Sequence, residues 1–541
     1  NQGRYRGGVI VEKVNNRRFY PFRTMARITL GFVADDTTGF KGIETAYNDH
    51  LRGRGGRQLV QRIPGGVEVP LSEYAGIEAI DGLDVVTTLN VYMQDVVSTA
   101  LAQAVDRHKA KSGVAILMEV ETGHIKALAN YPETYNTGVA TLLEPGSTFK
   151  LATLLAAAEA GQFDPNDTVQ TGNGTWQVSD RTLRDAHALG RISAQQAFEK
   201  SSNVGIAKLI DRYYGKRPDE FVSRLQRLGV LGASGVDLKG EPTPDIIRPN
   251  DPHWNATTLP WLSIGYNVRL TPLQIVSFYN AVANSGKRMA PLLVKELRRG
   301  SQVVERFEPR VVDRAIASQA SLALARELLE GVVTRGTAKS IASPNFTMVG
   351  KTGTAQKLEN GSYQRRYRAS FCGYFPAQNP RYTCFILIDD PTEGAYYGGD
   401  VAAPVFRAIA DQLYATDTHL SATVKAAPRA ERKVLYPISR VVHTEDARTV
   451  YNRLSISAPR DADSPYARTW QQGAVVREAS FRQPSGRVPA VVGMSAKDAV
   501  AVLEGAGLTV RLRGVGRVRR QSLAAGGAYR RGQTIELTLT H

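Results

Sequence analysis

Short runs of apolar residues fill the start of the chain, and longer periodic stretches follow from residue 84 onward. The stretch 1–82 is rich in glycine and arginine, and its short apolar runs predict an irregular β-rich region. Residues 85–91 predict a strand, and the apolar side chains of 93–108 recur at helical spacing. Residues 113–130 then predict two strands joined by a tight turn. This order of helix and hairpin indicates an α+β domain.

The middle of the chain predicts mostly helices, and the stretch after it predicts a sheet. An alanine-rich helix is expected to begin near Leu151 and to end at Gly161, which suits the left-handed residue that closes a helix. Further helices are expected at residues 194–199, 204–214, 272–283, 318–333 and 406–414. Three successive antiparallel strands are expected at residues 346–356, 367–376 and 381–391.

The apolar pattern weakens after residue 426. Residues 446–456 resemble residues 498–508 at an offset of 52, so this part is either a linker or a degenerate copy of the segment that follows it. The final segment predicts a compact helix followed by three strands. We therefore expect four parts, with boundaries at 1–82, 83–425, 426–486 and 487–541.

Charge is distributed unevenly along the chain. Its 541 residues include 68 lysines and arginines against 51 aspartates and glutamates, a net charge of +17. Residues 426–541 hold 19 of the basic and 9 of the acidic residues, so most of the excess lies in the last fifth. No zinc-finger, RNA-recognition or basic-zipper pattern accompanies this charge. We expect an arginine-rich surface and no nucleic-acid partner.

Composition excludes several other classes of protein. A hydrophobic fraction of 42% with 22% charged residues is that of a globular protein. The longest apolar runs, 114–118 and 384–388, reach about a quarter of the roughly 20 residues that span a bilayer. The eight histidines form no metal-protease pattern, and two cysteines are too few for a zinc cluster. We expect no metal and no cofactor.

Candidate chemistry begins with Ser147 and Lys150, which stand three residues apart where the alanine-rich helix opens. Residues at this spacing lie on one face of a helix, so the Lys150 amine can approach the Ser147 hydroxyl. A neutral amine could accept the hydroxyl proton and activate Ser147 as a nucleophile. Free N–H groups at the start of the helix would stabilise an oxyanion. Such a pair alone is usually an ordinary helix start.

Two further motifs change this interpretation. Ser201-Ser202-Asn203 stands 54 residues after Ser147 at a predicted helix start, where alone it would be a cap. Lys351-Thr352-Gly353-Thr354 stands 204 residues after Ser147 on a predicted strand, where alone it would be an exposed edge with a glycine bulge. In this order and context, the three motifs resemble the signature of the penicillin-interacting serine acyltransferases.

An acyl transfer needs a base and a path for the proton. Lys150 would be the base and must be neutral, so we expect its pKa to be lowered by burial and by a neighbouring charge such as Lys351. Ser201 could relay a proton between Lys150 and the leaving nitrogen. Asn203 could hydrogen-bond the substrate amide.

The substrate also needs a clamp. Lys351 with the hydroxyls of Thr352 and Thr354 could hold a terminal carboxylate. Gly353 would let backbone approach closely. The edge strand that carries these residues could pair with an extended substrate.

Beyond these motifs, the chain resembles the class B penicillin-binding proteins, which are monofunctional D,D-transpeptidases. The matching stretches are 17–21, 41–44, 144–150, 200–203, 264–286, 351–356 and 369–376. The resemblance implies an α+β fold of the penicillin-binding and serine β-lactamase type, an antiparallel sheet with helices, preceded by a β-rich pedestal at 1–82. It also implies cross-linking of peptidoglycan stem peptides through an acyl-enzyme on Ser147, with release of D-Ala, and covalent inhibition by β-lactams.

The resemblance assigns further details. In the family, the oxyanion hole is formed by two backbone N–H groups, which correspond to Ser147 and Thr354. The family works outside the cytoplasm, where disulfides can form. Cys372 and Cys384 lie on neighbouring predicted strands and could be bonded or could be buried thiols.

Partners are also implied by the resemblance. No glycosyltransferase sequence is visible, so glycan strands from lipid-linked precursors would come from a multipass membrane glycosyltransferase of the divisome, which would meet the region 1–82. Because the chain starts at Asn1 without Met, a signal or anchor segment could have been cut away. The resemblance implies that the protein is held to the membrane by an N-terminal anchor outside this chain. The protein would then lie on the extracytoplasmic side of the bacterial inner membrane.

The last segment, 487–541, resembles a PASTA domain, which favours the division-specific members of the family and a role in the septum. It departs from the usual pattern at Leu523, where proline is common. Its arginine-rich strands could contact an acidic surface instead of the wall.

Two other functions would share some of these features. A serine β-lactamase or a β-lactam sensor has the same three motifs, but a hydrolase needs a residue that activates water, and none is evident in the sequence. A scaffold that binds peptidoglycan without catalysis is a different class, and the motif residues that remain intact argue against it: Ser147, Lys150, Ser201, Asn203 and Lys351. Labelling with a penicillin separates the scaffold from the enzymes.

Overall fold

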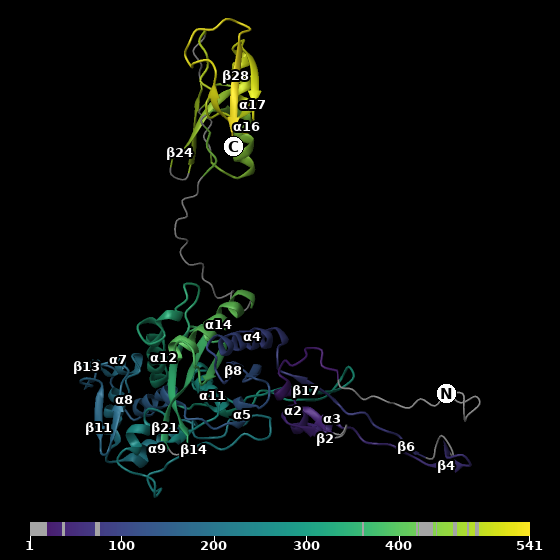
Figure 1. Cartoon of the computed structure of the whole chain (residues 1–541), viewed down its shortest axis with the longest axis vertical. Coiled ribbons are helices and arrows are strands. Elements are labelled where there is room, and N and C mark those ends of the chain that lie inside the picture. The colour runs from purple at the N-terminus through teal and green to yellow at the C-terminus, as the bar shows by residue number, and fades with distance from the viewer. Residues whose placement is uncertain are drawn as a thin grey trace. The chain divides into compact units, whose positions relative to one another are not determined.

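The protein is described by a computed structural model (Figure 1). The described residues are 19–34, 38–70, 76–359, 362–417, 420, 436–439, 441–457, 462–472, 475–481 and 486–540. The chain divides into two compact units, Asn1–Thr423 and Val424–His541. The β-like run at 8–14 and much of the weak stretch after residue 426 lie outside the described residues. Among the described helices, none has the length and apolar character needed to cross a membrane.

The first part of the larger unit consists of short elements. The helices are α1 (Arg27–Leu30), α2 (Gly42–Ala46) and α3 (Asn48–Leu51), and the strands are β1 (Phe32–Ala34), β2 (Thr38–Phe40), β3 (Arg57–Gln58), β4 (Val60–Ile63), β5 (Val67–Pro70) and β6 (Gly76–Ile77). The strands form antiparallel two-stranded ribbons, β1 with β2, β3 with β6 and β4 with β5. Figure 1 shows β4 and β6 well away from the central sheet. The Tyr47 hydroxyl donates to Asp237 and ties this region to the following domain.

A five-stranded antiparallel sheet forms the centre of the larger unit. Its order is β20 (Val349–Glu359), β21 (Ser362–Phe375), β22 (Tyr382–Asp389), β8 (Ser112–Glu119) and β9 (Ile125–Tyr131). The three late strands and the early hairpin are those that the sequence predicts, and β20 lies at the edge. Its bulge falls between Gln356 and Leu358 and not at Gly353, where the alternative interpretation of the motif as an ordinary edge strand places one.

Helices cover both faces of this sheet. A Cβ at Gly113 would touch Leu101 and Val105 of α4 (Val91–Arg107), whereas the next residue, Val114, faces α5 (Thr137–Ala140). Because successive residues of a strand point to opposite faces, α4 and α5 lie on opposite sides. Helix α11 (Pro272–Ala283) packs beside α5, and α14 (Ala403–Thr416) packs beside α4.

The remaining elements of this unit surround the sheet. The helices are α6 (Lys150–Glu159), α7 (Ala194–Glu199), α8 (Asn203–Tyr214), α9 (Pro218–Arg227), α10 (Thr258–Leu262), α12 (Gln319–Thr334) and α13 (Gly398–Val401), with 3-10 turns η1 (Gly146–Phe149) and η2 (Lys339–Ile341). The strands are β7 (Asp84–Thr87), β10 (Thr168–Gln170), β11 (Thr175–Val178), β12 (Arg181–Arg184), β13 (Arg191–Ser193), β14 (Asp245–Ile246), β15 (Val268–Arg269), β16 (Arg288–Met289), β17 (Val294–Arg299), β18 (Gln302–Arg306) and β19 (Val311–Asp313).

Both cysteines are buried free thiols. They stand on paired strands, but Cys372 lies opposite Phe385 and Cys384 lies opposite Gly373. The register therefore offsets the two cysteines by one residue. The sequence left open a disulfide or two buried thiols, and the structure shows the buried thiols.

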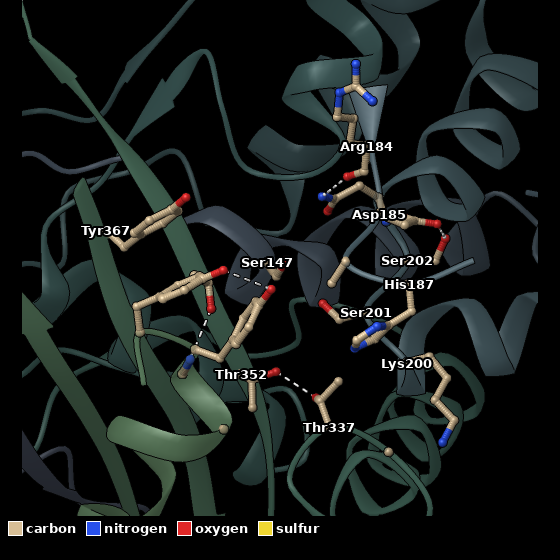
Figure 2. A pocket seen from close by; sticks show the side chains of 18 of the residues that line it. Ser147, Arg184, Asp185, His187, Lys200, Ser201, Ser202, Thr337, Thr352 and Tyr367 are labelled. Atoms are coloured by element: carbon tan, nitrogen blue, oxygen red, sulfur yellow. Dashed lines mark hydrogen bonds between the residues drawn. The ribbon is translucent and has the colours of Figure 1, made fainter. Parts of the chain in front are cut away.

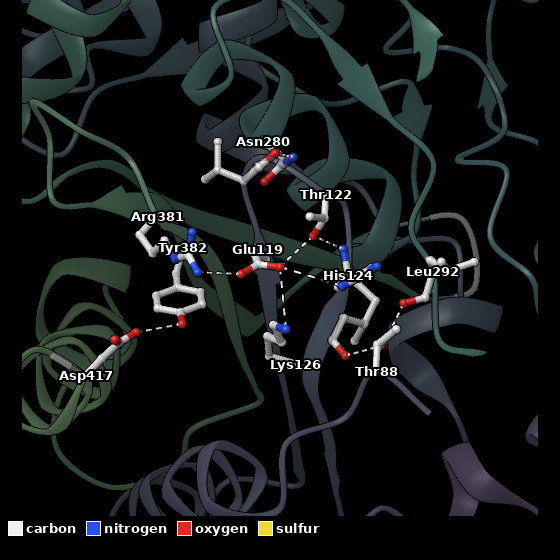
Figure 3. A network of polar contacts seen from close by, with 12 residues as sticks. Thr88, Glu119, Thr122, His124, Lys126, Asn280, Leu292, Arg381, Tyr382 and Asp417 are labelled. Atoms are coloured by element: carbon white, nitrogen blue, oxygen red, sulfur yellow. Dashed lines mark hydrogen bonds and ion pairs between the residues drawn. The ribbon is translucent and has the colours of Figure 1, made fainter. Parts of the chain in front are cut away.

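A buried carboxylate joins the end of the β8–β9 hairpin to its surroundings (Figure 3). Glu119 accepts a hydrogen bond of 2.6 Å from Thr122 and lies 3.0 Å from Arg381 and 3.5 Å from Lys126. Burial alone would raise the pKa of Glu119, but the Thr122 hydroxyl and the two cations lower it below its usual value. Glu119 is therefore ionised, and its contacts hold the turn end of this hairpin in place.

The smaller unit contains two three-stranded sheets. The first is β23 (Val442–His443), β24 (Tyr466–Gln472) and β25 (Val475–Ser480), and the second has the order β26 (Thr509–Arg513), β28 (Thr534–Thr540), β27 (Arg517–Gln521). Helix α17 (Ala496–Gly505) precedes the second sheet as the sequence predicts. Helix α16 (Thr444–Arg453) has the same length and begins 52 residues earlier, which is the offset of the suspected repeat.

Candidate active site

Ser147 lies in the 3-10 turn η1, and α6 begins at Lys150. The predicted helix start near Leu151 agrees with this boundary, and the opening turn that carries Ser147 is a 3-10 turn. This turn is tighter than an α-helical turn. It starts at Gly146, which has a φ of 54° and whose N–H donates to the Gly265 carbonyl at 3.1 Å. Side chains three residues apart eclipse in a 3-10 helix, so Ser147 and Lys150 remain on one side. Ser147 is half-buried and lines a cavity, whereas Lys150 is fully buried.

The Lys150 amine is held by the second motif. It donates to the Ser201 carbonyl at 2.7 Å, to the Asn203 Oδ1 at 2.8 Å and to the Ser201 Oγ at 3.3 Å. Burial lowers the pKa of Lys150 to about 7, although the carboxylate of Asp185 acts in the opposite direction. A substantial share of the amine is therefore neutral near pH 7 and able to accept a proton.

Asp185, which the sequence analysis does not single out, fixes the turn that carries Ser202 and Asn203. Asp185 accepts hydrogen bonds from the Asn203 N–H at 2.5 Å, the Val204 N–H at 3.0 Å and the Ser202 hydroxyl at 2.6 Å. Ser202 is the N-cap of α8, so it plays the capping role while its neighbours on either side contact Lys150. Asp185 follows a short strand with no local signal that would mark it.

The third motif places a second buried amine next to the first. Lys351 is fully buried, and its Nζ donates to the Ser201 Oγ at 2.8 Å and to the Thr352 carbonyl at 3.1 Å. Its pKa is well below the usual value because of burial and because of the charge of Lys150. Lys351 is not among the residues that line the cavity, whereas Thr352 and Thr354 are, and the Thr352 hydroxyl lies 2.7 Å from that of Thr337.

Glycine allows the edge strand and a short helix to pack closely. A Cβ at Gly353 would lie 2.2 Å from the Ser370 Oγ, and one at Gly398 would lie 2.3 Å from the Gly353 carbonyl oxygen. The Gly398 N–H donates to the Thr354 hydroxyl at 3.0 Å. The first residue of α13 therefore fixes the side chain of Thr354 and leaves the strand accessible from the cavity.

The three motifs meet at one cavity of about 600 Å³ (Figure 2). Figure 2 shows Ser147, Ser201 and Thr352 around the same hollow. Aromatic residues form part of the wall, with the rings of Tyr367 and Tyr396 stacked at 4.3 Å. The full lining is Ser147, Arg184, Asp185, Ala186, His187, Leu189, Lys200, Ser201, Ser202, Asn203, Tyr266, Gly336, Thr337, Thr352, Thr354, Gln356, Tyr367, Tyr396, Tyr397, Gly398, Gly399 and Asp400.

This arrangement can carry out acyl transfer to and from a serine. A hydroxyl faces a cavity large enough for a peptide, and the buried amine that follows it by three residues has a pKa near neutrality. Among the described residues, no group of three or more His, Cys, Asp or Glu side chains is placed to hold a metal ion.

Comparison with known proteins agrees with this class of chemistry. Residues 113–411 match the family described as the penicillin binding protein transpeptidase domain, and residues 486–541 match the PASTA domain. The fold and the family match define a penicillin-interacting serine acyltransferase. The chain belongs to the penicillin-binding protein transpeptidase family and carries a C-terminal PASTA domain.

Curated relatives include the probable peptidoglycan D,D-transpeptidase PenA of Neisseria gonorrhoeae, 31% identical over 409 residues, which are 73% of this chain and 67% of PenA. The peptidoglycan D,D-transpeptidase FtsI of Escherichia coli is 27% identical over 410 residues, 73% of this chain and 66% of FtsI. Among solved structures, penicillin binding protein 3 of Mycobacterium tuberculosis has a TM-score of 0.63 and 28% identity, covering 74% of this chain and 90% of that one. That protein has also been solved with aztreonam and with ampicillin.

Proposed function

We propose that this protein is a peptidoglycan D,D-transpeptidase that works through an acyl-enzyme on Ser147. The observation that carries the proposal is the buried Lys150 amine, which contacts Ser201 and Asn203 and has a pKa of about 7. A lysine at an ordinary helix start would be exposed and protonated, and water would satisfy its hydrogen bonds in place of these side chains.

The reaction would proceed in two balanced steps. Neutral Lys150 takes the proton of Ser147, whose Oγ attacks the carbonyl between two D-Ala residues, and Ser201 passes the proton to the leaving nitrogen. The bond to the terminal D-Ala breaks and the stem peptide stays on Ser147. The amine of a second stem peptide then attacks this ester, its proton returns along the same path, and Ser147 is released.

The other residues bind and orient the substrate in this proposal. The N–H groups of Ser147 and Thr354 hold the oxyanion. Asn203 hydrogen-bonds the substrate amide, while the hydroxyls of Thr352 and Thr354 bind the terminal carboxylate. Lys351 takes part through its hydrogen bond to the Ser201 Oγ. The edge position of β20 supports backbone pairing with an extended peptide.

Mass spectrometry after reaction with a penicillin tests the nucleophile. We expect one added mass of the drug, located on the peptide that contains Ser147, and no adduct on the folded Ser147→Ala variant. An adduct that persists on Ser147→Ala would remove this residue from the mechanism.

The lifetime of the adduct separates a transpeptidase from a β-lactamase. A transpeptidase keeps the drug bound for many turnovers of its normal reaction, because deacylation by water is slow. Loss of the adduct within seconds, with steady release of opened drug, would instead indicate a hydrolase.

The domain boundaries 1–82, 83–425, 426–486 and 487–541 remain proposals, as do the partners. We propose that the region 1–82 is a pedestal that meets a membrane glycosyltransferase of the divisome, on the extracytoplasmic side of a membrane to which an N-terminal anchor holds the protein. Exposed apolar side chains support a contact there, including Leu59 at 59% and Ile77 at 68% exposure. Co-purification from membranes tests this, and an interaction that survives deletion of residues 1–82 would contradict it.

A further inference from the structure

The PASTA domain separates its charges between two faces. Residues 486–541 contain nine lysines and arginines and three acidic residues. Two of the acids, Asp498 and Glu504, are on α17. The inward residues of the central strand, Ile535, Leu537 and Leu539, are buried in the core with this helix. The opposite face of the sheet is therefore turned away from most of the negative charge.

The register of the sheet defines what that opposite face presents. Residues that alternate with the buried ones point outward. They are Thr534, Glu536, Thr538 and Thr540 on β28, Thr509, Arg511 and Arg513 on β26, and Arg517 on β27 together with Arg519 and Arg520 at the bulge of that strand. Within these three described strands, the outward face holds arginines, threonines and one glutamate.

One row crosses all three strands. Arg513 pairs with Thr538 on one side, and Arg520 pairs with the same Thr538 on the other. Neighbouring strands are about 4.8 Å apart, so two guanidinium groups flank one hydroxyl across about 10 Å. Arg511 and Arg513 extend the charge along β26 at a spacing of about 6.8 Å. Glu536 pairs with Arg513 at 2.5 Å and neutralises only part of this charge.

We propose that this face, the arginine face, binds a flexible linear polymer that carries phosphate groups along its length. Arginine binds phosphate through two parallel N–H groups, and the threonine hydroxyl adds a donor between the two side chains. One row of charge runs along β26 and a second row crosses the sheet from Arg513 to Arg520. This pattern fits an extended chain with repeated charges better than it fits a single small anion.

Two other anionic partners fit this face less well. A membrane-binding surface normally carries aromatic or aliphatic side chains that insert between lipids, and the outward positions of these strands have none. Single-stranded nucleic acid is held by bases stacked on aromatic rings, which these positions also lack. The inference concerns a site remote from Ser147 in sequence and does not depend on the proposed acyl transfer.

Binding of the full chain to long-chain inorganic polyphosphate tests the proposal, measured by fluorescence anisotropy at several salt concentrations. The variant Arg513→Gln/Arg520→Gln loses two phosphate contacts, which should weaken binding roughly twentyfold at 0.1 M salt and lower the slope of log K against log salt by about 1.4. The matched control, Arg487→Gln/Arg530→Gln, removes the same charge from outside the three strands and should bind nearly as the unaltered chain does.

The remaining outcomes overturn the proposal. Equal weakening by both double variants would mean that net charge alone attracts the polymer. Absence of binding to polyphosphate would mean that the face does not take phosphate chains. Tighter binding to vesicles of phosphatidylglycerol and phosphatidylcholine, or to a thirty-nucleotide oligothymidine, would assign the face to a membrane or to nucleic acid. An unchanged unfolding temperature shows that both variants are folded.

Discussion

The carboxylate of Asp185 accepts a hydrogen bond from the backbone N–H of Asn203 at 2.5 Å. The same residue, Asn203, receives the Lys150 amine on its side-chain oxygen at 2.8 Å. Asp185 thus acts on the proposed base in two ways. It holds the turn that presents Asn203, and its negative charge raises the pKa of Lys150 against the effect of burial.

The variant Asp185→Asn should separate these two effects. Loss of the charge lowers the pKa of Lys150, so the acid limb of the acylation rate should move to lower pH. Weaker support for the turn should lower the plateau of the rate about tenfold, since a misplaced group commonly costs one to two orders of magnitude. The measurement is acylation by a chromogenic β-lactam between pH 5 and 9.

A matched control stands on the same hairpin. Asp180 is exposed in the turn between β11 and β12, and Asp180→Asn should leave both the plateau and the midpoint unchanged. A purely structural role for Asp185 would lower the plateau without moving the midpoint, and this result would contradict the electrostatic part of the prediction.

The pH dependence of the unaltered protein follows from Lys150. Its pKa of about 7 means that the neutral, active form increases as the pH rises through 7, so acylation should rise and then level off above about pH 8. Lys150→Ala should lower the plateau by about 10³-fold, within the usual range for a general base. Lys200→Ala, which removes an exposed amine at the cavity, is the control. Fast acylation of Lys150→Ala at neutral pH would eliminate it as the base.

Close packing at Gly398 predicts that any side chain at this position destabilises the fold. A Cβ would lie 2.3 Å from the Gly353 carbonyl oxygen and 2.4 Å from that of Ser370, so α13 must move away from β20. Gly398→Ala should lower the free energy of unfolding by about 1–3 kcal/mol and slow acylation. Gly55→Ala meets nothing within 4 Å and serves as the control in a denaturant titration. Equal stability of the two variants would show that α13 is not packed as described.

Removal of the smaller unit should leave the chemistry intact. All proposed site residues, from Ser147 to Thr354, lie in the unit Asn1–Thr423. A chain that ends at Thr423 should therefore be acylated at the same rate as the full chain, as measured by stopped-flow with a chromogenic β-lactam. A folded truncated chain that reacts more than tenfold slower would mean that the PASTA unit supports the site.

The sequence predicts the elements whose signals are local. Helices α7 and α11 have the predicted bounds because Ser193 and Thr271 each form a capping box with a glutamine three residues later. The strands of the central sheet are marked by apolar runs bounded by turn residues, and β8 and β22 are buried along nearly their whole length. The 3-10 turn at Ser147 could not be read in this way, because it depends on Gly265 more than a hundred residues away.

The proposed site shows the same division. The three motifs are visible as sequence, and the structure brings them together. The role of Asp185 beside the second motif could not be predicted from the sequence, because this residue acts through backbone N–H groups, which every sequence has. Burial of Lys351 could not be deduced either, since the edge of a sheet is usually exposed and here α12 packs against β20.

The hydrogen bond from the Lys351 Nζ to the Ser201 Oγ joins residues that are 150 positions apart in the chain. Such a contact closes a long loop, and the entropy of loop closure must be overcome before the contact contributes to stability. A chain in which β20 has not yet joined the sheet keeps the contact of Lys150 with Ser201 but lacks that of Lys351. Reactivity toward a β-lactam consequently requires that β20 has joined the sheet, and the growth of the adduct during refolding measures how fast the complete site is assembled.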